Sequence, residues 1–117
     1  MKISTVAEIL DAKILCCGDL SDAEVCSACG SDMMSDVLAF VKDQAVLLTG
    51  LVNTQVVRTA EMMDMRCIVF VRSKKPTDEI VELAEKCGIV VMATDKRMYE
   101  ACGKLYAGGL VGNKTAK

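Results

Sequence analysis

Two Ser-Asp pairs stand at the front of an apolar run in the first third of the chain. Ser31-Asp32 and Ser35-Asp36 lie four residues apart, so on a helix the serines would share one face and the aspartates another. Two carboxylates on one face could do acid–base chemistry, or bind Mg²⁺ together with serine oxygens. The ordinary alternative is that Ser31 caps the helix and both aspartates face solvent near its positive end. A like-charge pair at this spacing costs only tenths of a kcal/mol, so it demands no catalytic function.

A C-x-x-C motif provides a second candidate chemistry. Cys26 and Cys29 form the motif, with Cys16-Cys17 upstream. Thiolates at the spacing of a C-x-x-C motif can share one tetrahedral metal ion or an iron–sulfur cluster. Cys26 and Cys29 are therefore the candidate metal ligands. The alternative is that they are small thiols buried in a strand. The chain has seven cysteines, an odd number, and its N-terminus lacks a signal-peptide pattern. We therefore expect reduced thiols and a cytoplasmic protein.

Composition argues against several classes of function. The sequence contains no His, which removes the commonest general base and the Ser-His and Cys-His nucleophiles, so we do not expect an enzyme. A net charge of −2 argues against a nucleic-acid partner. No apolar run approaches the roughly 18 residues of a membrane-spanning helix. The sequence indicates no particular cofactor.

The second half of the chain alternates strand and helix patterns. Continuous apolar runs at 45–49, 67–71 and 89–92 are typical of parallel strands covered on both faces. Asn53 or Thr54, Thr77 and Thr94 are the expected N-caps of the three helices that follow. The pattern predicts right-handed crossovers and a mostly parallel sheet with helices on both faces.

The first third has shorter and more mixed runs. Thr5 and Glu8 have the spacing of a capping box and predict a helix through Leu10. Strands are expected at 13–17 and 23–29, and a helix at 31–41. Together the elements predict one α/β domain over 1–110, followed by a flexible tail at 111–117.

The elements place a set of polar residues at one edge of the sheet. Ligands of such folds bind outside the carboxyl ends of the strands, where helix N-termini also present backbone N–H groups to anions. The candidate ligand-binding residues are Ser31, Asp32, Thr49, Gly50, Asn53, Arg72 and Lys74. The alternative is that the basic residues form a solvated loop and the others serve only as caps.

Several stretches resemble DRTGG domains. Residues 30–40, GSDMMSDVLAF, are similar to the family's SDLLSDV stretch. Residues 49–53, 58–62 and 68–76 resemble the strands and helices that follow it, and 99–110 resemble its C-terminal close. The resemblance runs from about residue 22 to 110. The chain departs from the family's name-giving Asp-Arg-x-x-Thr-Gly-Gly motif at 22–30, where Cys26 and Cys29 lie.

The resemblance implies a three-layer α/β/α sandwich of four or five strands, similar to the N-terminal domains of HPr kinase/phosphorylases and Mur ligases. It implies no kinase activity, because the phosphate loop of those kinases lies in another domain. DRTGG domains look like accessory modules beside CBS pairs or phosphotransacetylases. Small stand-alone members similar to this chain are associated with iron-hydrogenase and redox genes.

Two hypotheses of function follow. The first is a non-enzymatic regulatory or ligand-binding module that senses a small anion or nucleotide and acts on a partner enzyme. We expect this module to form a homodimer or higher homo-oligomer. The alternative is a redox or metal accessory protein that uses Cys26 and Cys29 to hold zinc or an iron–sulfur cluster, in association with hydrogenase or redox systems.

Overall fold

The structure is a computed structural model, and it describes residues 1–40 and 45–111. The expected end of the second helix at Val41 and the expected tail at 112–117 lie outside the described residues. Within the part of the chain that is described, no helix is both long and apolar enough to span a membrane.

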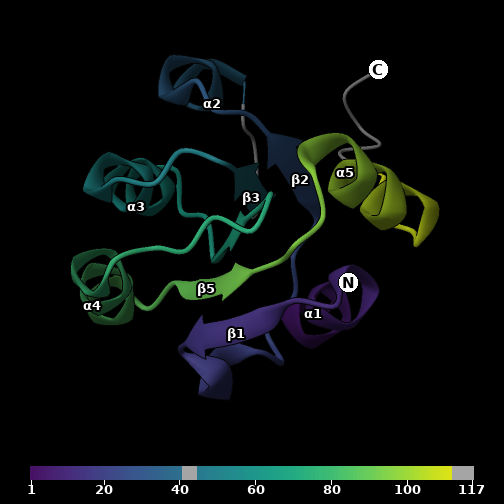
Figure 1. Cartoon of the computed structure of the whole chain (residues 1–117), viewed down its shortest axis with the longest axis horizontal. Coiled ribbons are helices and arrows are strands. Elements are labelled where there is room, and N and C mark those ends of the chain that lie inside the picture. The colour runs from purple at the N-terminus through teal and green to yellow at the C-terminus, as the bar shows by residue number, and fades with distance from the viewer. Residues whose placement is uncertain (41–44, 112–117) are drawn as a thin grey trace.

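The five strands form one sheet in the order β1-β5-β4-β3-β2 (Figure 1). They are β1 (Lys13–Cys16), β2 (Ser27–Gly30), β3 (Ala45–Thr49), β4 (Cys67–Phe70) and β5 (Val90–Ala93). Strands β2 to β5 are parallel, and β1 runs antiparallel beside β5. Every residue of β3 and β4 is buried, as their continuous apolar sequences indicate. The mostly parallel sheet is confirmed.

Helices cover both faces of the sheet (Figure 1). One layer contains α2 (Met34–Phe40), α3 (Thr54–Met62) and α4 (Asp78–Cys87), and the other contains α1 (Ile3–Leu10) and α5 (Met98–Ala107). Successive side chains of the central strands point to opposite faces of the sheet. Leu47 packs toward α2–α4, whereas Val46 and Leu48 pack toward α1 and α5. A single 3₁₀ turn, η1 (Gly18–Leu20), follows β1. The three-layer α/β/α sandwich is therefore confirmed.

Local helix signals were predicted well in the regular half of the chain. The Asn53 side chain accepts a hydrogen bond from the Val56 N–H at 3.2 Å, and Thr77 Oγ1 accepts one from the Ile80 N–H at 3.3 Å. These are the expected N-caps of α3 and α4. Helix α4 ends at Gly88, whose φ of 72° is the left-handed conformation that glycine adopts without strain.

The capping-box prediction for the first helix was wrong. Helix α1 begins at Ile3, so Thr5 lies inside it. The N–H groups of Ile3 and Ser4 donate to the carbonyls of Ala23 and Ser21, at 3.0 and 2.9 Å. Because the chain at 21–23 satisfies these donors, the helix starts without a side-chain cap.

The second strand is shorter than expected, since it begins at Ser27 rather than at residue 23. The preceding residues pair with the N-terminus instead. The Val25 N–H donates to the Met1 carbonyl at 2.8 Å, and Lys2 and Glu24 form an isolated antiparallel bridge. This pairing holds 23–25 beside the start of α1.

Two further helix starts also differ from the prediction. Helix α2 begins at Met34, and Ser31 Oγ accepts the Met33 N–H at 3.0 Å in the turn before it. Helix α5 begins at Met98, so Thr94 is not its cap. The buried Thr94 hydroxyl instead donates to the Leu10 carbonyl at 2.7 Å, because the end of α1 lies against the end of β5.

Candidate functional site

The carboxylate of Asp32 links the segments that follow β2, β3 and β4. Its Oδ1 accepts hydrogen bonds from the Thr49 hydroxyl at 3.0 Å and from the Gly50 N–H at 2.7 Å. Its Oδ2 lies 3.4 Å from Arg72 Nη2. The parallel register sets Gly30 beside Leu48 and Thr49 beside Phe70, so the three loops emerge side by side. Asp32 is therefore a fixed anion at the carboxyl edge of the sheet.

The Asp32–Arg72 pair is accessible to solvent. The Asp32 side chain is 47% exposed and the Arg72 side chain 45%. An ion pair this exposed contributes only about 0–1 kcal/mol to stability. A guanidinium has five N–H donors, so Arg72 retains donors for a further anion while it stays beside Asp32.

Gly50 is required for the position of Arg72. A Cβ at residue 50 would overlap the Arg72 guanidinium, which lies over the backbone of this loop. The Thr49 hydroxyl also accepts the Leu51 N–H at 3.1 Å, which orders the turn beneath the guanidinium. Residues 49–51 thus form a platform on which Arg72 rests.

The loop after β4 has an unusual backbone. Arg72 and Ser73 both have φ of 60°, the left-handed region that costs a residue with a Cβ about 1–2 kcal/mol. Their N–H groups donate to the carbonyls of Lys96 at 2.8 Å and Thr94 at 3.1 Å, which hold the loop in place. This conformation points Arg72 toward Asp32 and brings Ser73 Oγ within 3.0 Å of Asp95 Oδ1. Strained loop residues of this kind cluster at binding sites.

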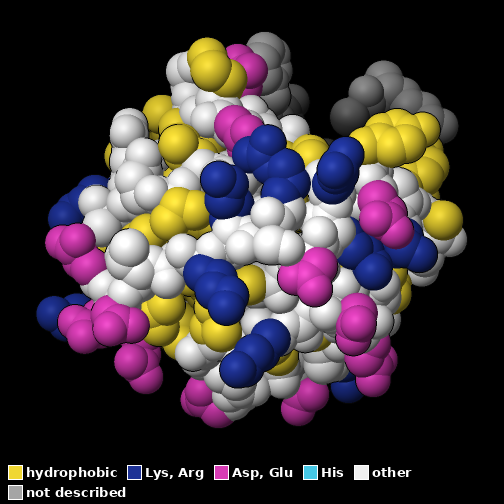
Figure 2. All heavy atoms as spheres, in the orientation of Figure 1, with side chains coloured by type: hydrophobic (Ala, Val, Ile, Leu, Met, Phe, Trp, Pro, Cys, Tyr) yellow, Lys and Arg dark blue, Asp and Glu magenta, His cyan; other side chains and the backbone are white. Residues whose placement is uncertain are grey.

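A basic pocket of about 320 Å³ lies beside this loop. Its lining includes Lys13, Lys74 and Lys75 together with Ser73, and the carboxylates present are those of Asp11 and Asp95. Figure 2 shows Lys and Arg side chains gathered near the centre of the face crossed by the loops after β4 and β5, with acidic side chains among them. Three ammonium groups against two carboxylates favour an anionic occupant.

The predicted ligand-binding residues divide into three groups. Asp32, Thr49, Gly50 and Arg72 are joined by hydrogen bonds or direct packing. Lys74 lines the adjacent basic pocket. The side chains of Ser31 and Asn53 make local hydrogen bonds, Ser31 within its own turn and Asn53 at the start of α3, while the Ser31 N–H donates to the Leu48 carbonyl of β3 at 3.0 Å.

Sequence reasoning missed several pocket residues. Lys13 reaches the carboxyl edge only because β1 is antiparallel, which pairs its first residue with Ala93 at the end of β5. A lone apolar run has no signal for strand direction, so Lys13 could not be placed. The predicted strand ends do place Lys75 and Asp95 at this edge, although neither is among the candidate ligand-binding residues.

The two cysteines of the C-x-x-C motif lie in different surroundings. Cys26 is exposed just before β2, and Cys29 is half-buried within it. Because Cys26 lies outside the strand, the alternation of side chains along β2 does not fix its direction relative to Cys29. Among residues 1–40 and 45–111, no group of three or more His, Cys, Asp and Glu could hold a metal ion. Metal binding by Cys26 and Cys29 remains a prediction without a third ligand in the described part of the chain.

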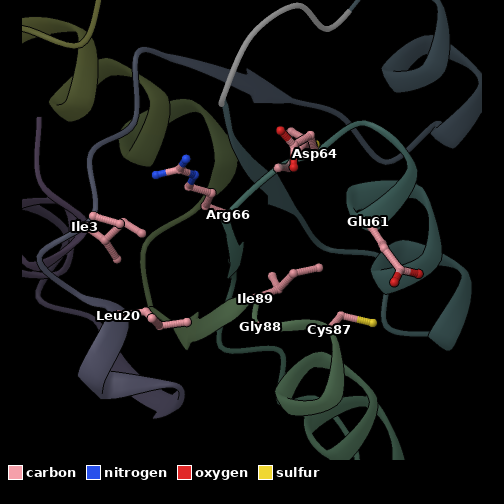
Figure 3. Close-up of a pocket in the computed structure, with 10 residues that line it drawn as sticks. Ile3, Leu20, Glu61, Asp64, Arg66, Cys87, Gly88 and Ile89 are labelled. Carbon is pink, nitrogen blue, oxygen red and sulfur yellow. The ribbon is translucent and has the colours of Figure 1, made fainter.

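A second pocket of about 290 Å³ lies at the opposite edge, before β4 and β5 (Figure 3). Glu61 of α3 and Cys87 of α4 are directed toward one another there. Burial and the hydrogen bond with Glu61 raise the pKa of the Cys87 thiol. Asp64 and Arg66 add one charge of each sign. This edge is therefore less suited to an anion than the basic pocket.

The chain is similar to one known domain family and to a solved structure that contains this domain. The family model described as the DRTGG domain matches residues 5–107. A similar solved structure is the regulatory region, with CBS and DRTGG domains, of Clostridium perfringens pyrophosphatase in complex with its activator, diadenosine tetraphosphate. The TM-score is 0.70 at 15% sequence identity, over 89% of this chain and 45% of that chain, a likeness of fold. No curated protein matches the chain.

Proposed function

The chain belongs to the DRTGG domain family, and we propose that it is a regulatory module that binds a small phosphate-bearing anion or nucleotide at the carboxyl edge of its sheet. In this proposal the module acts on a partner enzyme and does no chemistry itself. The observation that carries it is the basic pocket of Lys13, Lys74 and Lys75 beside the exposed Arg72.

The chemistry of the pocket suits phosphate. Lysine ammonium groups bind phosphate as point charges, and a guanidinium binds it with two parallel N–H donors. The Ser73 hydroxyl donates to Asp95 Oδ1 at 3.0 Å and would have to turn from this carboxylate to donate to a bound phosphate. A ligand with several phosphates could contact the lysine pocket and Arg72 at once, because Arg72 and Lys74 belong to the same short loop.

The solved relative supports a nucleotide as the first class to test. Its regulatory region was crystallised with diadenosine tetraphosphate, the activator of that pyrophosphatase. The present chain spans 45% of that chain, so the likeness to it covers only part of that regulatory region. The absence of His from the sequence favours binding over acid–base catalysis.

The test is calorimetric titration and thermal unfolding with pyrophosphate, AMP, ATP and diadenosine tetraphosphate. A ligand at 100 times its Kd should stabilise the protein by about 2.7 kcal/mol. The double variant Arg72→Ala/Lys74→Ala should lose this stabilisation. The matched control is Arg58→Ala/Lys86→Ala, which removes the same charge from exposed positions on α3 and α4.

The two possible contradictions are distinct. If none of the four compounds stabilises the wild-type protein, phosphate-bearing ligands are excluded as the class. If one binds equally well to the wild-type protein and to Arg72→Ala/Lys74→Ala, the ligand site lies elsewhere on the molecule.

A further inference from the structure

Both tyrosines of the chain project from α5 on the side turned away from the sheet. Tyr99 is 93% exposed and Tyr106 65% exposed, whereas Ala101 and Leu105 of the same helix are buried against the sheet. Figure 2 shows hydrophobic side chains at the edge of the molecule where α5 lies in Figure 1. Tyrosine is enriched at protein–protein interfaces, because its ring is apolar and its hydroxyl can stay hydrated.

A glycine lies between the two tyrosines. Tyr99, Gly103 and Tyr106 recur at the i, i+4, i+7 spacing of one helix face. A Cβ at Gly103 would meet no heavy atom within 4 Å, so no contact within the chain requires glycine there. Glycine is the least favourable residue inside a helix after proline. Its presence is explained if another backbone or a large side chain approaches this face from outside.

These residues line a shallow groove of about 560 Å³ on the outer face of α5. Its lining includes Tyr99, Gly103 and Tyr106 together with Glu100 and Lys104. The order Tyr-Gly-Tyr is nearly the same when read in reverse. A second α5 running in the opposite direction would therefore bring its tyrosines beside those of the first helix, with Gly103 letting the helices come close.

The charged residues of this helix are also arranged so that two antiparallel copies would match each other. Glu100 and Lys104 are exposed on one flank of the groove. A twofold axis perpendicular to two antiparallel helices brings equivalent flanks together. With the axis near residue 102, Glu100 lies opposite the partner's Lys104, and the same pair forms again on the other side of the axis.

We propose that α5 packs antiparallel against α5 of a second copy of this chain, which makes the protein a C2 dimer. With that axis Tyr99 lies beside the partner's Tyr106 at each end of the contact, the two Gly103 residues lie near its middle, and the Glu100–Lys104 pairs set the direction. A partner of another kind would have no reason to match a face that is complementary to itself in both shape and charge. The proposal is independent of the ligand site, which involves the loops after β2 to β5.

The test is sedimentation velocity of the wild-type protein over a concentration series. We expect a monomer–dimer equilibrium that Tyr99→Ala weakens by at least about tenfold, as truncation of a central interface aromatic does. Glu100→Lys should also weaken the dimer, because it opposes like charges. The double swap Glu100→Lys/Lys104→Glu should restore the dimer, since each new Lys again faces a Glu.

The control is Met62→Ala, which removes another highly exposed apolar side chain, on α3 in the opposite layer. It should leave the dimer unchanged, and circular dichroism should show every variant folded. A wild-type protein that stays monomeric at all concentrations would overturn the proposal. So would a dimer that persists in Tyr99→Ala, because it would have to form through another surface.

Discussion

The guanidinium of Arg72 lies over the backbone of Gly50, in the space that a side chain at residue 50 would need. Two loops that follow different strands thus fit together through one glycine and one arginine. Because the overlap involves the end of a flexible side chain, the arginine can move when the glycine is replaced. The contact is therefore expected to matter more for the site than for the stability of the fold.

Gly50→Ala tests this contact. We expect the free energy of unfolding to fall by less than about 1 kcal/mol, because Arg72 is half-exposed and can swing into solvent. Anion binding should weaken as much as in Arg72→Ala, since both changes remove the guanidinium from its place. Urea denaturation and calorimetry measure the two effects. A variant with wild-type affinity would show that the position of Arg72 is irrelevant to binding.

Asp32→Asn removes the charge that neutralises Arg72. The amide oxygen can still accept the Gly50 N–H, so we expect a stability change within about 1 kcal/mol. Phosphate or nucleotide should bind several-fold more tightly, because the resident carboxylate no longer repels it. Calorimetric titration of both proteins in the same buffer provides the comparison. Weaker binding in Asp32→Asn would instead mean that Asp32 helps to hold the ligand.

Thr94→Val should destabilise the fold from a buried position. The Thr94 hydroxyl donates to the Leu10 carbonyl at 2.7 Å and is 4% exposed as a residue. Valine has nearly the same shape but removes the donor to that carbonyl and the acceptor of the Lys96 N–H, which lies 3.2 Å from the Thr94 hydroxyl, at a cost of about 1–3 kcal/mol. The midpoint of urea denaturation reports the change. Thr94→Ser keeps the hydroxyl and should lose clearly less; equal losses would assign the effect to packing.

Buried and partly buried thiols make the free energy of unfolding depend on pH in the alkaline range. Burial raises the pKa of Cys67 above its usual value of 9.0, and burial together with Cys16 raises that of Cys17 to about 11. The unfolded chain therefore releases these protons first, so stability is full below about pH 9 and falls as pH rises from there. Urea denaturation at pH 7 to 10 measures the slope. Cys67→Ala should lower the free energy of unfolding at every pH in this range, yet make its decrease with pH shallower. An unchanged pH dependence would show that Cys67 is not its source.

Native mass spectrometry of protein purified without oxygen tests the cysteine hypothesis. We expect the mass of the polypeptide without metal, because within the described residues no further His, Cys, Asp or Glu joins Cys26 and Cys29 in a group of three. Added mass equal to zinc or an iron–sulfur cluster would contradict this expectation, provided that it is lost in Cys26→Ser. Cys87→Ser is the control, since Cys87 lies at the opposite edge of the sheet.

The sequence by itself determined the architecture of the regular half. Runs such as 45–49 and 67–71 contain only residues that favour buried strands, and the caps Asn53 and Thr77 mark helix starts through bonds to residues three positions away. Such signals are local, so they can be read without knowing what packs where. The alternation of strands and helices along the chain also predicts that Arg72 and Lys74, which follow the run 67–71, lie at the carboxyl edge of the sheet.

Tertiary structure decided the features that depend on distant segments. Helix α1 starts at Ile3 because carbonyls of residues 21 and 23 satisfy its N–H groups, and Lys13 joins the basic pocket because β1 runs antiparallel. Asp32 binds the loop after β3 instead of the start of its own helix, because that loop offers it two donors, the Thr49 hydroxyl and the Gly50 N–H. In each case the residue that makes the contact comes from a distant part of the chain, so the local sequence does not predict it.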